Sequence, residues 1–381
     1  MKRLLRNGII SPAGLKALLA GRLIRKLAPK KTDYAAVDIG SREIKVVQVS
    51  IADGSPVVTA SGRLPTPVGA LDTPINESEL VNALNKVILA SGIRVNEVIA
   101  TISGDRVITR HVKLPVMPAR ELEAAVNFEI ERFVPVPVEE LIIRYVNLGV
   151  IKSGGERFFH LLLAAVPASF VYDYYGIFAK AGLNIAVIDL QSLSLWRLFS
   201  GLKTSAARKG TVGIFDIGAS TTQFLVVRDR ALQLTRTLPV GGNLLTRSLA
   251  AHYGLGYLEA QRMKEDEGEL FSVEQAASAT ASAMQTDFSL RDGLTGLVRE
   301  IRRSLDYYAA QENATAIERY IISGGTSKMK GFRDFFAEAM GTPVDFGYPG
   351  VPGVPGDDPT AARFDPAFAV VLGSALREVV E

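Results

Sequence analysis

One short pattern occurs twice in this chain and constrains its fold more than any other feature. An apolar residue, then Asp-Ile-Gly and a small residue, stands at Val37–Ser41 and again at Phe215–Ala219. Each copy follows an apolar run and precedes another, as expected of two strands joined by a short turn. One such turn is an ordinary hairpin. Two copies with the same flanks, with Asp38 and Asp216 178 residues apart, indicate two duplicated domains that face one cleft.

The turn also has the composition of a phosphate-binding loop. Gly40 and Gly218 allow the backbone to approach a phosphate group with no side chain in the way. Backbone amides and neighbouring hydroxyls can then donate hydrogen bonds to phosphate oxygens. Asp38 and Asp216 would repel a phosphate, so we expect them to hold Mg²⁺ through its water shell. Lys45 can reach a phosphate as a point charge. The hydroxyls in question belong to Ser41, Ser220, Thr221 and Thr222.

A third glycine motif follows a predicted strand near the end of the chain. Tyr320–Ser323 is apolar, and it leads into Gly324, Gly325 and Thr326, with a predicted helix soon after. Paired glycines would let an adenosine lie against the backbone, and the helix N-terminus favours polar contacts. Taken alone, this segment could be a simple strand-to-helix turn. Together with the duplicated turn, it favours a nucleotide cleft.

Composition excludes several other classes of protein. Hydrophobic residues make up 48% of the 381 and charged residues 22%, as in a globular protein. The absence of cysteine excludes disulfides and thiolate zinc sites, and the three widely spaced histidines make an imidazole metal site unexpected. The sequence shows no membrane-spanning helix and no signal peptide. We therefore expect a cytoplasmic protein.

The basic residues are concentrated at one end. Nine of the 43 lysines and arginines lie in residues 1–31, which hold no acidic residue. The remaining 34 basic residues face 40 acidic ones, which leaves a net charge of −6. Ser11-Pro12 predicts a helix start, and leucines on one face make the following helix amphipathic. This extension could bind the anionic inner membrane or a partner. It could equally pack on the protein's own body or form an unstructured leader.

The order of predicted elements divides the chain into an extension at 1–31, a first domain at 32–205 and a second at 206–381. The first domain holds an inserted α+β subdomain at about 95–165. The insertion contains a helix at Arg120–Phe133, which Pro135 and Pro137 stop, and two strands at 142–150 and 158–166. The polar and small residues at 203–210 predict a linker between the domains. Residues 368–380 predict a final helix.

Across residues 33–381 these motifs resemble, in order and spacing, the phosphate and adenosine motifs of the actin/Hsp70/sugar-kinase superfamily. The insertion in the first domain is similar to that of FtsA and its relatives. Within that group the chain is similar to the PilM family of type IV pilus assembly. The segments that carry this similarity are Asp38–Gln48, Asn127–Glu140, Arg236–Thr246, Leu297–Tyr308 and Val371–Arg377.

The resemblance implies an α/β actin-like ATPase fold, with two RNase H-like domains around a cleft for ATP and Mg²⁺. It adds Gly242 and Lys264 to the expected nucleotide contacts. It also implies that the first domain binds the cytoplasmic tail of the membrane-anchored protein PilN. Other inner-membrane pilus components, motor ATPases and a second copy of the chain are further expected partners, and nucleic acid is not. The candidate contacts for the tail are Arg132, Phe133, Pro135 and Pro137, although Phe133 could instead belong to a core.

Two positions depart from the family pattern. Gln261 stands where relatives carry a glutamate before the lysine of the ribose-binding helix, and Gln191 where they often have an acid. A neutral amide can position water but is a poor base. We therefore expect at most slow hydrolysis and a role as a nucleotide-binding scaffold. Two alternatives are a membrane-associated, filament-forming division protein like FtsA and a sugar-kinase-type phosphotransferase.

Overall fold

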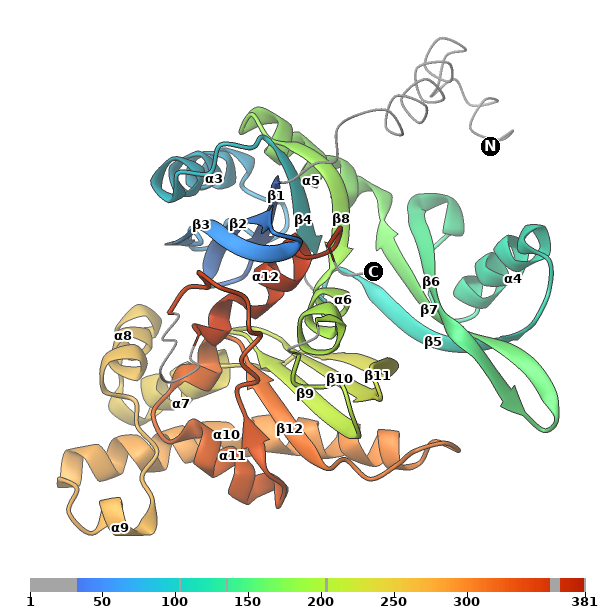
Figure 1. Ribbon diagram of the computed structural model, residues 1–381. Helices are drawn as coiled ribbons and strands as arrows, with labels where there is room; N and C mark the ends of the chain where they lie inside the picture. The colour runs from blue at the N-terminus through green and yellow to red at the C-terminus, as the bar shows by residue number, and fades with distance from the viewer. Residues whose placement is uncertain (1–32, 103, 135, 203–204, 357–363, 380–381) are drawn as a thin grey trace. The chain divides into compact units, whose positions relative to one another are not determined.

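The duplication appears as two five-stranded sheets with equivalent strand orders (Figure 1). The computed structural model describes residues 33–102, 104–134, 136–202, 205–356 and 364–379. The basic extension predicted at 1–31 lies outside these ranges. The first sheet has the order β3-β2-β1-β4-β8 and the second β11-β10-β9-β12-β13. In each sheet a hairpin pair is antiparallel, whereas the strands beyond it (β4 and β8, β12 and β13) add in parallel.

The strands of the first sheet are β1 (Asp33–Ile39), β2 (Glu43–Ala52), β3 (Ser55–Pro65), β4 (Glu97–Ile102) and β8 (Asn184–Leu190). Those of the second are β9 (Thr211–Ile217), β10 (Thr222–Arg228), β11 (Ala231–Leu238), β12 (Arg319–Ser323) and β13 (Val344–Asp345). We call each sheet with the helices on its outer face a lobe.

Helices cover the outer face of each sheet. In the first lobe α3 (Glu77–Ser91) and α5 (Ala168–Lys180) pack on alternate residues of β1, β2 and β4. The Asn76 side chain caps α3 by accepting the Glu79 amide hydrogen at 3.3 Å. In the second lobe the helices are α7 (Asn243–Tyr253), α8 (Tyr257–Glu267), α9 (Val273–Ala276), α10 (Ala281–Ala309) and α11 (Phe332–Met340).

The inner faces of the two sheets share one apolar core. It contains Val47 and Ile99 of the first sheet and Ile214 and Leu225 of the second. Between them lie α6 (Gln191–Trp196), the π-helical turn Arg197–Gly201 and α12 (Ala369–Ala375). Because α12 is buried on every side, its small apolar residues can pack against both lobes. We predicted that 206–381 would all belong to the second domain, but α12 contacts β2, β4 and α6 of the first.

A three-stranded antiparallel sheet is inserted in the first lobe, in the order β5-β7-β6. Its strands are β5 (Ile108–Pro115), β6 (Leu141–Ser153) and β7 (Glu156–Pro167), and α4 (Ala119–Glu131) packs on it. The insertion begins later than the predicted residue 95, because β4 pairs with β1 in the main sheet. A 3₁₀ turn at Val138–Glu140 leads into β6.

Two histidines connect the inserted sheet to the second lobe. The Thr235 amide donates a hydrogen bond of 2.9 Å to Nε2 of His111. Nδ1 of His111 therefore carries the proton and donates to Nε2 of His160, also at 2.9 Å. Burial, with His160 beside it, lowers the pKa of His111 to about 3. Both rings are thus neutral in the neutral pH range, and this junction depends on their tautomers.

None of the helices in the described ranges has the length and apolar character needed to span a bilayer. Within the same ranges, no three His, Asp or Glu side chains gather as a metal site.

Candidate functional site

A cleft of about 650 Å³ lies between the two sheets, where the β1–β2 and β9–β10 turns face each other. This volume is in the range of small-molecule sites in proteins. α8 and the loop after β12 complete its walls. Of the residues predicted from the sequence, those that line the cleft are Asp38, Gly40, Ser41, Lys45, Gln191, Asp216, Gly218, Ser220, Thr221, Lys264, Gly324, Gly325 and Thr326.

Two predicted contacts lie behind the wall of the cleft. The Thr222 hydroxyl is fully buried and donates to the Val240 carbonyl at 2.8 Å, so it is committed to the protein. Gly242 instead offers its carbonyl to Nζ of Lys264 at 3.1 Å. A Cβ on Gly242 would lie 2.4 Å from Oγ1 of Thr326, which explains the need for glycine there. Both residues shape the site without lining it.

The two phosphate-type turns close in the same way. The Gly40 amide donates to the Glu43 carbonyl at 3.0 Å, and the Gly218 amide to the Thr221 carbonyl at 2.9 Å. The third glycine, Gly324, has φ +86° and lies so close to β9 that a Cβ would be 2.5 Å from the Ile217 carbonyl oxygen. Three glycines, Gly40, Gly218 and Gly324, therefore bring bare backbone to the cleft.

Each aspartate of the repeated motif is held by a hydroxyl on the neighbouring parallel strand. Asp38 pairs in register with Thr101 of β4, and Asp216 pairs in register with Ser323 of β12. Oγ1 of Thr101 donates to Oδ1 of Asp38 at 2.5 Å, and Oγ of Ser323 donates to Oδ1 of Asp216 at 2.7 Å. Burial raises the pKa of Asp216 to about 6, although Ser323 and Lys45 act against that rise. The sequence did not single out either hydroxyl.

A chain of side-chain amides crosses the floor of the cleft. Nε2 of Gln191 donates to Oδ1 of Asp38 at 3.1 Å, and Oε1 of Gln191 accepts from Gln223 of the second lobe at 3.5 Å. Gln223 in turn accepts from the Thr237 hydroxyl at 3.1 Å. Lys45 lies 4.0 Å from Asp38. Asp38 is thus contacted by a hydroxyl, one neutral amide and a lysine, which can orient water but are poor bases at neutral pH.

Lys264 is enclosed by acceptors of the second lobe. Its ammonium donates to Oγ1 of Thr246 at 2.8 Å and to Oε1 of Gln261 at 3.0 Å, in addition to the Gly242 carbonyl. Burial lowers the pKa of Lys264 to about 8, with Glu265 acting in the opposite direction. Gln261 therefore serves to hold Lys264 and, through its amide, Glu265 at 2.6 Å.

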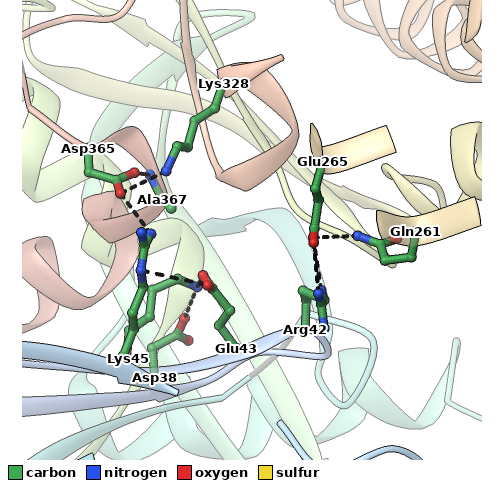
Figure 2. Close-up of polar contacts among 10 residues, drawn as sticks. Asp38, Arg42, Glu43, Lys45, Gln261, Glu265, Lys328, Asp365 and Ala367 are labelled. Carbon is green, nitrogen blue, oxygen red and sulfur yellow. Dashed lines mark hydrogen bonds and ion pairs between the residues drawn. The ribbon is translucent and has the colours of Figure 1, made fainter. Parts of the chain in front are cut away.

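Two ion-pair systems span the cleft, as Figure 2 shows. Arg42, in the β1–β2 turn, forms a bidentate pair with Glu265 of α8, at 3.1 Å from Nε and 2.9 Å from Nη2. Arg63 of β3 lies 2.8 Å from Asp365, which also accepts from Lys328 at 2.9 Å. Sequence reasoning missed all five side chains. Two of them could have been suspected from their neighbours in the sequence, because Arg42 directly follows Ser41 and Glu265 directly follows Lys264, both predicted nucleotide contacts.

The residues predicted to contact a partner lie on the inserted subdomain, outside the cleft. Phe133 packs on the core of the insertion, with the Arg110 guanidinium 4.6 Å from its ring centroid. Arg132 is exposed and pairs with Glu129 at 3.0 Å, and Pro137 is exposed. Pro135 lies outside the described residues.

Two duplicated lobes around one cleft define the class: this is an α/β protein with the two-lobed actin-like ATPase fold. The chain belongs to the family of the type IV pilus assembly protein PilM, which matches residues 36–378.

Two solved structures and one curated protein are similar to this chain over most of its length. A structure described as the PilM-PilN type IV pilus biogenesis complex has 25% sequence identity and a TM-score of 0.79, and covers 93% of this chain and 100% of that one. The cell division protein FtsA of Bacillus subtilis (strain 168) is 19% identical over 353 residues, 84% of this chain and 80% of FtsA. The ethanolamine utilization protein EutJ from Carboxydothermus hydrogenoformans has 17% identity and a TM-score of 0.51, over 92% and 90% of the two chains, and shares the fold.

Proposed function

We propose that this protein is an ATP-binding scaffold of type IV pilus assembly, which couples the state of its nucleotide to binding of the cytoplasmic tail of a PilN-like inner-membrane protein. The observation that carries the nucleotide half is the matched pair of aspartates. Asp38 and Asp216 occupy equivalent positions in two duplicated sheets, each is hydrogen-bonded to a hydroxyl, and both line one cleft.

The residues of the cleft suit Mg²⁺-ATP chemically. Amides of the two turns other than those of Gly40 and Gly218, together with the hydroxyls of Ser41, Ser220 and Thr221, would donate to phosphate oxygens, and Lys45 would add a positive charge. Asp38 and Asp216 would hold Mg²⁺ through its water shell. The backbone at Gly325, where the position of a Cβ is open space, would receive the adenosine beside Gly324, which packs on β9. When bound, the metal ion would neutralise part of the negative charge of the phosphates. The protein would hold the nucleotide in position and exclude water from the cleft.

Slow or no hydrolysis fits the groups near Asp38. Hydrolysis of a phosphoanhydride needs a residue that orients the attacking water, and often one that accepts its proton. Gln191 and Gln223 can orient a water molecule, but neither accepts a proton at neutral pH. We therefore propose that the nucleotide acts by favouring one arrangement of the lobes.

The junction between the first lobe and the inserted sheet is the proposed site for the tail. One arm of the cleft reaches this junction at Leu71, Arg106 and Phe170. The Arg106 guanidinium lies 5.4 Å from the Phe170 ring centroid and donates to the Leu71 carbonyl. Phe170 and Ile142 pack against the same small core, and Ile142 follows Pro137 by five positions in the sequence. Arg132 and Pro137, both exposed, remain proposed contacts, and the similarity to a PilM-PilN complex supports this half of the proposal.

We further propose that the protein works at the cytoplasmic face of the inner membrane. The basic extension at residues 1–31 supports this, since clustered lysines and arginines are attracted to anionic lipid headgroups. Deleting these residues should release the protein from anionic vesicles. Unchanged partition would exclude the extension as the attachment site.

Titration calorimetry with Mg²⁺-ATP tests the nucleotide half. The Asp38→Ala and Asp216→Ala variants should each lose at least about tenfold in affinity, since each removes one anchor of the metal shell. The matched control is Asp334→Ala, which removes an exposed carboxylate from α11. If both cleft variants bind as tightly as the control, the nucleotide site is misassigned.

A synthetic peptide of the PilN-like cytoplasmic tail tests the other half. Its affinity should differ between protein saturated with Mg²⁺-ATP and protein without nucleotide. Equal affinity in the two states would show that the nucleotide does not affect binding of the tail, contrary to the proposal.

A further inference from the structure

The Arg42–Glu265 pair connects the two elements that would contact a nucleotide from opposite sides. Arg42 lies in the β1–β2 turn beside Ser41, and Glu265 lies on α8 beside Lys264. All four residues line the cleft. The bidentate geometry fixes both the separation and the orientation of the turn and the helix, because a planar guanidinium matches a carboxylate through two parallel hydrogen bonds.

Hydrogen bonds extend this pair into the wall of the cleft. Oε1 of Glu265 also accepts from Gln261 at 2.6 Å, and Gln261 accepts from Lys264 and from the Thr246 hydroxyl at 2.6 Å. The guanidinium of the first lobe is thus linked through Glu265 and Gln261 to Lys264 of the second. When the lobes separate at this edge, the Arg42–Glu265 contact has to break, and the rest of the cluster stays with the second lobe.

The second cross-cleft pair is built differently. Asp365 accepts from Lys328 at 2.9 Å and from the Ala367 amide at 3.0 Å, both on its own side of the cleft. It therefore keeps charged and amide partners when Arg63 leaves. Arg63 itself lies 3.8 Å from Glu43. Among the described residues, Glu265 accepts hydrogen bonds from Gln261 and Arg42, with Lys264 beside it, and Arg42 supplies both of its charge-assisted hydrogen bonds.

We propose that the Arg42–Glu265 pair is a clasp across the cleft, which has to open before a nucleotide enters or leaves and so sets how long the nucleotide stays bound. This inference rests on the proposed nucleotide site. Both side chains are 43% exposed. Water and salt therefore compete with the pair, and the clasp opens readily enough to regulate exchange.

Stopped-flow fluorescence with an N-methylanthraniloyl derivative of ATP and Mg²⁺ tests the clasp. In Arg42→Ala and Glu265→Ala, capture and release should both accelerate by a similar factor, about three- to fivefold, so that Kd changes little. The reciprocal variant, Arg42→Glu with Glu265→Arg, should return both rates to within about twofold of the wild type, as a restored pair requires. The control is Arg303→Ala, which removes an exposed arginine paired within α10.

The outcomes separate the clasp from the site beneath it. If the wild type captures no nucleotide, the proposed function fails. If the wild type binds but the single variants exchange at its rate, the clasp is overturned and the site stands. Faster release with unchanged capture, or no recovery in the reciprocal variant, would mean that Arg42 contacts the ligand directly, which also overturns the clasp. Added salt should accelerate exchange in the wild type and have less effect in Arg42→Ala.

Discussion

Gly373 lies where α12 and α6 come closest, and replacing it with alanine should weaken the core between the lobes. A Cβ at this position would lie 2.1 Å from the Ser194 carbonyl oxygen and 2.6 Å from its carbon. Those atoms belong to the backbone of a buried helix, so they cannot move aside as a flexible side chain would. Arg197 adds to the rigidity, because one of its nitrogens donates both to Asp189 and to the Gly373 carbonyl.

Two opposing contributions give the magnitude. Alanine in place of glycine inside a helix stabilises by about 0.8–1 kcal/mol, whereas forcing an extra methyl group into a packed core costs about 1–3 kcal/mol. With backbone atoms as the obstacle, the upper end of that range applies, and Gly373→Ala should lower the free energy of unfolding by about 2 kcal/mol. Gly176 of α5 is the matched control, because its nearest neighbour would be Oε1 of Glu77 at 3.8 Å. Gly176→Ala should raise the same free energy by up to about 1 kcal/mol.

Urea unfolding followed by the fluorescence of Trp196 measures both changes. Trp196 is the single tryptophan of the chain, ends α6 and donates from Nε1 to the Arg230 carbonyl at 2.8 Å, so it reports on this junction directly. The midpoint should fall for Gly373→Ala and rise for Gly176→Ala, with the slope unchanged. Equal stabilisation of both variants would show that α12 does not approach α6 as described.

Three further predictions follow from the polar contacts. The pKa of His111 is lowered to about 3, so between pH 6.5 and 3 the unfolded chain binds a proton that the folded chain does not. The free energy of unfolding should therefore fall by up to about 1.4 kcal/mol per pH unit on acidification. His111→Gln should flatten this slope when stability is measured as a function of pH. Because the pKa of Lys264 is lowered to about 8, nucleotide affinity should weaken as pH rises through 8, and Lys264→Arg should remove that dependence in calorimetry. Thr101→Val removes the donor to Asp38 and should weaken Mg²⁺-ATP binding by about tenfold, while a variant that binds normally would show that the hydroxyl is dispensable.

Local patterns were sufficient for the parts of the fold that depend on neighbouring residues. The repeated Asp-Ile-Gly turn is a contiguous pattern, and the structure has it as two equivalent hairpins. The helix predicted at 120–133 is α4, which ends just before Pro135, as proline requires. The actin-like fold and the PilM family, both predicted from these motifs, are confirmed. The assignments of individual site residues stay predictions.

Contacts between distant residues could not be read in this way. Arg42 and Glu265 are separated by 223 positions, and neither has a local pattern that points to the other. Thr101 and Ser323 acquire their role only when a parallel strand places them beside an aspartate. Strands β3, β5 and β11 were not predicted, because they are partly exposed strands with mixed composition. The return of α12 to the first lobe likewise depends on shape complementarity at Gly373.

The core shared by the two sheets makes the lobes one folding unit. Phe199 and Leu372 fill the space between Val47 on one side and Ile214 on the other, so neither sheet can bury its inner face alone. Heat should therefore melt both lobes in a single calorimetric transition despite their duplicated architecture. A gene fragment ending near residue 205 would encode a first sheet whose inner face, with Val47 and Ile99, is exposed to water.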